Sequence, residues 1–274
     1  MAQSVIMLNG IVKKYGPKTV LKGVNMTVNK GDIYGLIGKN GAGKTTLFKV
    51  LLGLSDFQDG KLSILGAKNE NENRKNRRKI GFFVGANFFG YLNARQNLDY
   101  YRKVKGIKDV NEVDRVLKIV GLDTDAAKAP AKRFSLGMKQ RLGIANALLG
   151  NPEIIILDEP TNGLDPQGIH DIRELIGKLN EKYGTTIIVS SHILSELENT
   201  AHRFGIVHEG VLMREMTRED MKNESGLYSI EVRDVDGPRA AEILKENGIN
   251  VVKASGKANS LEDFYFEMIG GEKH

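Results

Sequence analysis

The residues with the clearest chemical potential form a glycine-rich stretch near the N-terminus that ends in a lysine and two threonines. It matches the pattern G-x-x-x-x-G-K-[ST], which surrounds a phosphate group with backbone amides. Glycines suit this task because no Cβ separates their backbone from the anion. The pattern predicts a nucleotide-phosphate site, and its residues are Gly38, Lys39, Asn40, Gly41, Ala42, Gly43, Lys44, Thr45 and Thr46.

The sequence on both sides of this phosphate loop supports the interpretation. Residues 33–37 are a short apolar segment typical of a buried strand, and residues 46–52 have the apolar spacing of a helix. A helix that begins at the loop directs the positive end of its dipole at the anion. Lys44 is then expected to reach the β- and γ-phosphates, and the Thr45 hydroxyl suits Mg²⁺. A chance glycine-rich turn would lack these flanking elements.

A pair of carboxylates follows a second buried segment. Residues 154–157 are all apolar, which is typical of a strand inside a parallel sheet, and Asp158 and Glu159 come directly after them. In such sheets the nucleotide lies at the carboxyl ends of the strands. We therefore expect Asp158 to hold Mg²⁺ together with Thr45, and Glu159 to orient or deprotonate an attacking water. Without the phosphate loop, a surface turn would be the commoner interpretation.

A family resemblance rests on residues 134–141, which read Phe-Ser-Leu-Gly-Met-Lys-Gln-Arg. This segment resembles the signature motif of ATP-binding cassette (ABC) ATPases, whose usual form is Leu-Ser-Gly-Gly-Gln. The serine and the second glycine are kept, whereas Phe134, Leu136 and Met138 depart from it. The variant is similar to that of multidrug, bacitracin-type and lantibiotic-type exporters. The resemblance covers residues 5–215, where further family elements occur in the family's order.

The resemblance implies roles for residues outside the phosphate loop. In this family two cassettes bind head to tail, and each ATP lies between the phosphate loop of one and the signature helix of the other. Ser135 and Gly137 would then face the γ-phosphate of the opposite subunit. Asp165 resembles part of the loop through which the two subunits communicate. His192 matches the family's switch histidine, which would contact the γ-phosphate and support Glu159, so that Glu159, His192 and Lys44 form the catalytic set.

Two further positions concern the base and the membrane partner. Tyr15 resembles the family aromatic that stacks on adenine, with a core tyrosine as the alternative. The family's Gln or Glu after a strand like residues 80–84 is replaced by Gly85, so either Asn87 substitutes or this loop coordinates the metal more weakly. The aromatic segment 88–92 fits a groove for a partner's helix, or else belongs to the core.

The order of the elements predicts an α/β fold, that of a P-loop NTPase with an antiparallel β edge. Helical spacing at 94–105 and 110–120 indicates a helical subdomain over about 86–150. We expect an ABC nucleotide-binding domain at 1–215 and a small α+β appendage at 216–274. Strands are expected at 5–12, 20–28, 33–37, 61–65, 80–84, 154–157, 186–190, 227–232 and 251–254, helices at 46–52, 94–105, 110–120, 136–149, 166–183, 238–247 and 261–269, and a hairpin over 203–213.

Composition limits the classes of function. The chain has 274 residues, a formal net charge of +6 and 41% hydrophobic residues, enough for one large domain with an appendage. It has no cysteine, which excludes disulfides and thiolate chemistry. No signal peptide is expected, and the apolar runs are too short to span a bilayer, so a membrane role requires a partner. The basic run 74–79 is interpreted as a solvated loop face, with contact to nucleic acid or anionic lipid as the alternatives.

These observations predict a transport-coupled ATPase that uses ATP and Mg²⁺. We expect the ATPase subunit of an ABC exporter at the cytoplasmic face of the membrane. Its expected partners are a second ABC ATPase subunit, most simply an identical copy, and transmembrane subunits on separate chains, with no nucleic acid. A soluble ABC ATPase acting on a protein or nucleic-acid assembly is the alternative, which Gly85 favours and the single cassette disfavours. A kinase or GTPase would not need the signature segment.

Overall fold

The computed structural model of the chain describes residues 3–85, 88–198, 200–224, 230 and 232–251. The chain divides into two compact units, Met1–Met221 and Lys222–His274, each described by itself. The domain limits that the sequence suggested, at residues 86, 150 and 215, stay predictions. In the second unit, α9 (Gly237–Glu246) lies where the helix 238–247 was expected. The other elements expected there fall wholly or partly outside the described residues.

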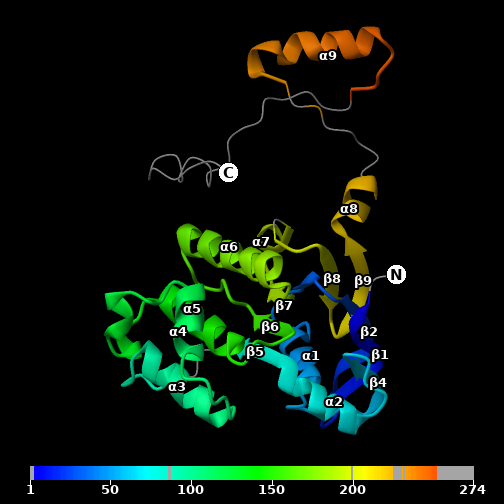
Figure 1. Ribbon diagram of the computed structural model, residues 1–274. Coiled ribbons are helices and arrows are strands. Elements are labelled where there is room, and N and C mark those ends of the chain that lie inside the picture. Colours follow the sequence, from blue (N-terminus) through cyan, green and yellow to red (C-terminus); the bar gives the residue numbers. More distant parts are fainter. Residues whose placement is uncertain (1–2, 86–87, 199, 225–229, 231, 252–274) are drawn as a thin grey trace. The chain divides into compact units, whose positions relative to one another are not determined.

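The first unit is organised around a mostly parallel sheet (Figure 1). Among the described residues this sheet has the strand order β5-β6-β7-β3-β8-β9, and only the β8–β9 pair is antiparallel. Parallel strands are covered on both faces, which explains their continuous apolar sequences. The strands are β3 (Ile33–Ile37), β5 (Ile80–Val84), β6 (Ile154–Asp158), β7 (Thr186–Ser191), β8 (Arg203–His208) and β9 (Val211–Thr217).

An antiparallel sheet forms the predicted β edge. It has the order β2-β1-β4, with bounds β1 (Ser4–Tyr15), β2 (Lys18–Asn29) and β4 (Asp59–Ile64). β1 and β2 extend beyond their predicted limits, because Tyr15 pairs with Lys18 across a tight turn at Gly16, whose φ is 56°. Alternating residues of these strands are buried, as their sequence pattern indicated.

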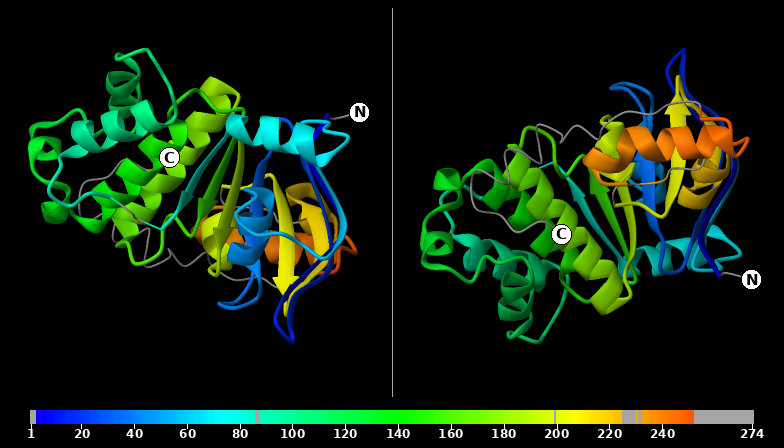
Figure 2. Two further views of the ribbon diagram at one scale, coloured as in Figure 1. Left: turned by 90° about the horizontal axis from the view of Figure 1, so that it is seen from below. Right: turned by 90° about the horizontal axis from the view of Figure 1, so that it is seen from above.

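Helices cover one face of the central sheet, whereas α1 and the antiparallel sheet cover the other. The two views of Figure 2 show α3, α4 and α5 on one side of it and β1 and β2 on the other. No helix in the described ranges is long and apolar enough to cross a membrane. The helices of the first unit are α1 (Lys44–Leu51), α2 (Glu70–Asn76), α3 (Ala94–Val104), α4 (Glu112–Ile119), α5 (Leu136–Leu148), α6 (Pro166–Tyr183) and α7 (Leu194–Glu198), and α8 (Arg218–Glu224) follows β9.

Strand β6 shows how the sheet separates two hydrophobic cores. Ile154 and Ile156 pack in a cluster with α1 and the antiparallel sheet, whereas Ile155 and Leu157 pack in a cluster with α5 and α6. Successive side chains of a strand point to opposite faces, so one apolar run supplies both cores. This double burial holds the end of β6, where the predicted carboxylates lie, in a fixed position.

The turn of the β8–β9 hairpin joins distant parts of the first unit. Glu209 and Gly210 both have positive φ, as a two-residue hairpin turn prefers, and the predicted hairpin is confirmed. The Gly210 N–H donates to the Ala42 carbonyl at 2.9 Å, and its carbonyl accepts from the Lys22 N–H at 2.8 Å. A Cβ at Gly210 would lie 2.1 Å from the Val20 carbonyl oxygen, so only glycine fits here.

A buried tyrosine also ties the two sheets together. The Tyr34 hydroxyl on β3 donates to Glu215 Oε1 on β9 at 2.8 Å, and the Thr27 N–H on β2 donates to the same oxygen at 3.0 Å. Burial, together with the Glu215 charge, raises the pKa of Tyr34 well above its usual value. The phenol therefore stays protonated and remains a hydrogen-bond donor.

Close packing of α5 on β5 depends on glycine. A Cβ at Gly143 of α5 would lie 2.2 Å from the ring of Phe83, and one at Gly81 would lie 1.9 Å from the Ala147 carbonyl oxygen. Neither neighbour is the free end of a flexible side chain. The helix can approach the strand only because both positions lack a side chain.

We expect Gly143→Ala to lower the free energy of unfolding by about 1–3 kcal/mol, because the Phe83 ring must shift within a packed core. Gly177→Ala on α6 is the matched control, since a Cβ there meets nothing within 4 Å. It should stabilise the helix by about 0.5–1 kcal/mol. Thermal unfolding followed by circular dichroism measures both. Equal melting temperatures for the two variants would contradict the packing argument.

Candidate nucleotide site

The phosphate loop connects β3 to α1 by a compact turn. Gly41 and Gly43 have φ values of 82° and 114°, a region that favours glycine. A Cβ at Gly38 would lie 2.5 Å from the Val207 carbonyl oxygen, so this position also requires glycine. No side chain of the described residues caps α1, which leaves its first amides to an anion. The loop thus has the geometry of a phosphate cradle.

Consecutive residues at the start of α1 contact consecutive residues at the end of β6. The Thr45 hydroxyl donates to Asp158 Oδ2 at 2.7 Å, and Lys44 Nζ lies 3.2 Å from Glu159 Oε1. Lys44 is 5% exposed, and its ammonium also donates to the Gly38 carbonyl. Hydroxyl and carboxylate oxygens are the ligands that Mg²⁺ prefers, so Thr45 and Asp158 fit that ion.

Glu159 lies between a lysine and a histidine. Its Oε2 is 2.9 Å from His192 Nδ1, and its Oε1 faces Lys44. The Glu159 backbone has φ of 50°, which is uncommon for a residue with a side chain. The structure therefore brings together the predicted set Lys44, Thr45, Asp158, Glu159 and His192. A carboxylate held in this way can accept a proton from water beside a phosphate.

Tyr15 lies at the end of β1 with its ring 46% exposed, so it is not a core tyrosine. Its hydroxyl lies 3.1 Å from Ser55 Oγ, and Lys13 Nζ lies 4.6 Å from the ring centroid. A cation near a ring face attracts its π electrons and favours one orientation of the ring. The remaining exposed surface of the ring is available to a planar base.

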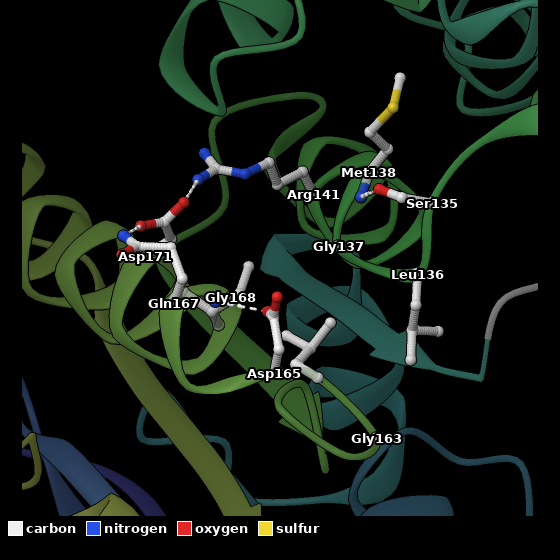
Figure 3. A pocket seen from close by; sticks show the side chains of 12 residues that line it. Ser135, Leu136, Gly137, Met138, Arg141, Gly163, Asp165, Gln167, Gly168 and Asp171 are labelled. Carbon is white, nitrogen blue, oxygen red and sulfur yellow. Dashed lines mark hydrogen bonds and ion pairs between the residues drawn. The ribbon is translucent and has the colours of Figure 1, made fainter. Parts of the chain in front are cut away.

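The signature serine and the predicted dimer loop line a different pocket. Ser135 caps α5 by accepting from the Met138 N–H at 3.2 Å, and Asp165 caps α6 by accepting from the Gly168 N–H at 2.9 Å. Figure 3 shows the pocket between these helix ends, and its volume is about 360 Å³. Gly137 lines it too, whereas the phosphate loop does not. One subunit therefore does not bring Ser135, Gly137 and Asp165 together with Lys44.

The segment after β5 has an open glycine and a partly exposed aromatic cluster. Gly85 has φ of 73° and a Cβ there would meet nothing within 4 Å, while Asn87 lies outside the described residues. The Phe89 ring packs edge-on against Tyr100 at 4.8 Å, and Tyr91 is 72% exposed. Phe88 packs against the core. The segment thus has one ring in the core and another that is exposed, and its contact with a partner's helix stays a prediction.

Two serines that lie near this site were not predicted from the sequence. Ser190 Oγ donates to Asp158 Oδ1 at 2.7 Å and accepts from the Glu159 N–H at 2.9 Å. Ser191 Oγ donates to Glu196 Oε2 at 2.7 Å, and the Thr161 hydroxyl donates to the same oxygen at 2.8 Å. The available signal was the pair of hydroxyls that ends an otherwise apolar strand just before His192.

Comparison with known proteins identifies the family. The family model described as ABC transporter matches residues 21–162. This chain belongs to the ABC transporter family. The bacitracin transport ATP-binding protein BcrA of Bacillus licheniformis is 39% identical over 98% of each chain. The lantibiotic transport ATP-binding protein SrtF of Streptococcus pyogenes is 39% identical over 83% of this chain and 97% of its own.

A solved structure carries the same fold and a nucleotide. A dimeric ATP-binding cassette in a post-hydrolysis state, bound to ADP and Pi, matches with a TM-score of 0.68 and 28% identity. The match covers 78% of this chain and 98% of that one. The predictions of the family, of the P-loop α/β fold and of a transport-coupled ATPase that binds ATP are confirmed. The roles assigned to individual site residues stay predictions.

The backbone at Gly85 yields a prediction about its replacement. Gly85→Gln should lower the free energy of unfolding by about 1 kcal/mol, because the cost comes from positive φ and not from a clash. Gly85→Asn should cost less, since asparagine adopts this conformation more readily. Chemical unfolding compares the two, and ATP affinity should change little in either. A larger loss for Asn than for Gln would show that positive φ is not the controlling factor.

Proposed function

We propose that this cassette is the ATP-hydrolysing subunit of an exporter, acting as a dimer on separate transmembrane chains at the cytoplasmic face of the membrane. The observation that carries the proposal is the position of Glu159 between Lys44 and His192, beside the Thr45–Asp158 pair. This arrangement offers a cation for phosphate, a base for water and oxygen ligands for Mg²⁺ in one place. The bacitracin and lantibiotic transport relatives support an export role.

Phosphoryl transfer from ATP to water requires the protein to position the reactants and neutralise their charge, and no covalent intermediate with the protein is needed. The loop amides and Lys44 bind the β- and γ-phosphates, which compete with Glu159 for the lysine ammonium. Mg²⁺, held by Thr45 and Asp158, would neutralise charge on the same phosphates. Glu159 accepts the proton of the attacking water, while His192 holds its second oxygen. Each of these residues leaves the sheet or α1 at the same edge, so no large movement within the subunit is required.

A second cassette is needed because one subunit presents two half-sites. Ser135, Gly137 and Asp165 lie around a pocket that the phosphate loop does not line. A head-to-tail arrangement would place the start of α5 of one subunit on the nucleotide of the other, where its N-terminal amides favour the γ-phosphate. Since this chain carries both half-sites, an identical copy suffices as the partner. The dimeric solved cassette supports this arrangement.

The aromatic surface beside α3 is our candidate for contact with a transmembrane subunit. Tyr91 and Tyr100 are 72% and 46% exposed, and their rings lie beside Phe89 in tilted and edge-on orientations. Exposed aromatic rings in a cluster are typical of binding surfaces. A soluble cassette acting on other assemblies remains the less favoured alternative, because the compared relatives are named transport proteins.

Glu159→Gln tests the ATPase mechanism. The variant keeps the shape of the side chain but removes the base, so it should bind ATP while hydrolysis falls by about 10²-fold or more. ATP that is not consumed should stabilise the dimer, which size-exclusion chromatography with MgATP detects. Lys44→Ala is the comparison, and it should lose tight ATP binding and remain monomeric. Normal turnover by a monomeric Glu159→Gln protein would exclude Glu159 as the base.

Tyr91→Glu tests the membrane-partner surface. The tagged cassette should co-purify with a multi-helix membrane protein from detergent-solubilised membranes of its own cell. Tyr91→Glu should weaken this recovery several-fold, because a charge replaces an exposed ring. Tyr183→Glu is the matched control, since Tyr183 is 45% exposed at the far end of α6. The surface assignment is wrong if both variants recover the membrane protein equally.

A further inference from the structure

Ser190 is a buried hydroxyl that touches both carboxylate residues of the site. Its exposed fraction is 0%, and it lies one residue before the end of β7. The hydroxyl donates to Asp158 Oδ1 at 2.7 Å and accepts from the Glu159 N–H at 2.9 Å. One oxygen atom therefore holds the side chain of the first acid and the backbone of the second.

The two contacts constrain different degrees of freedom. Asp158 accepts from Ser190 through Oδ1 and from Thr45 through Oδ2, so the plane of its carboxylate is fixed from both sides. Glu159 leaves the strand with φ of 50°, and its N–H turns to Ser190. A residue with a side chain holds such a conformation only where its surroundings enforce it.

We propose that Ser190 is a positioning residue that fixes the orientation of both the metal ligand Asp158 and the base Glu159. The inference rests on the proposed function, because it assigns a role within the same Mg²⁺-ATP site. The donated hydrogen bond leaves Asp158 Oδ2 directed at Thr45, and the accepted bond directs the Glu159 side chain to Lys44. Only a hydroxyl that donates and accepts at this position does both.

The neighbouring serine serves a separate purpose. Ser191 Oγ donates to Glu196 and accepts from the Ile193 N–H at 3.0 Å, on the side of the strand that leads to α7. It contacts neither Asp158 nor Glu159 by a described hydrogen bond. Ser191→Ala therefore removes a buried hydroxyl from the same strand end without removing the contacts that we assign to Ser190.

Ser190→Thr and Ser190→Val form a pair of equal shape that differs only in the hydroxyl. Both add a methyl group to a buried strand position, which β-branched residues suit. Loss of the hydroxyl leaves the Glu159 N–H without its acceptor and Asp158 without a donor. We measure Mn²⁺ binding by electron paramagnetic resonance with a saturating, non-hydrolysable ATP analogue, and we measure binding of the analogue without metal.

Ser190→Thr should keep Mn²⁺ affinity within about twofold, and Ser190→Val should lose roughly tenfold or more, as when a partner of a metal ligand is removed. Analogue binding without metal should be the same in both, because the phosphate loop is untouched. In Ser190→Val, kcat for ATP hydrolysis should fall by a larger factor than the KM for ATP rises. Ser190→Ala, which adds no bulk, decides the result if Ser190→Val melts below the assay temperature.

The controls distinguish the inference from the proposed function. If the unmodified protein binds the analogue no more tightly with Mn²⁺ than without it, the proposed Mg²⁺-ATP site fails. If the unmodified protein does show that dependence, and Ser190→Val and Ser190→Ala keep it, the role of Ser190 is overturned. Ser191→Ala should retain Mn²⁺ affinity. If it loses as much Mn²⁺ affinity as Ser190→Ala does, the role assigned to Ser190 is also overturned.

Discussion

The parallel pairing of β3, β7 and β6 is the constraint on which the rest of the site depends. Ile37 pairs with Ser191, and Ser190 pairs with Asp158, so the three strands end at nearly the same level. The phosphate loop, His192 and Glu159 begin at that level and face one another. A slip of one residue in either pairing would turn these side chains to the opposite face of the sheet. The chemistry therefore depends on a register that hydrophobic burial on both faces maintains.

Features with a local sequence signal could be predicted. The apolar runs of β6 and β7 identified buried strands, and the glycine spacing from Gly38 identified the phosphate loop, because both patterns reflect backbone geometry within a few residues. The two acids at the end of β6 could be linked to that loop because parallel strands end at one edge. The trans roles of Ser135 and Asp165 came from family resemblance alone, since no local pattern reports a second subunit.

Features that depend on register or on buried polar groups could not be predicted. The Ser190 contacts follow from which residue of β6 lies opposite it, and composition carries no such information. The expectation of a loop at 74–79 was wrong, because these residues lie in α2 and the 3₁₀ turn after it. The buried Asn73 anchors this polar helix by accepting from the Ile64 N–H and donating to the Leu62 carbonyl. The positive φ of Gly85 also lacks a sequence signal, because glycine permits either sign of φ.

The hairpin turn at Gly210 has a consequence for the order in which the cassette is built. This residue bonds to Ala42 in the phosphate loop and to Lys22 in β2, although it is synthesised long after both. Contacts between such distant parts of a chain form late, because the intervening segment must first be closed into a loop. A ribosome-bound chain that has not yet exposed Gly210 lacks these contacts. The hydrogen bond to Ala42 therefore forms only after the chain has been synthesised beyond residue 210, so a shorter nascent chain holds its phosphate loop without this support.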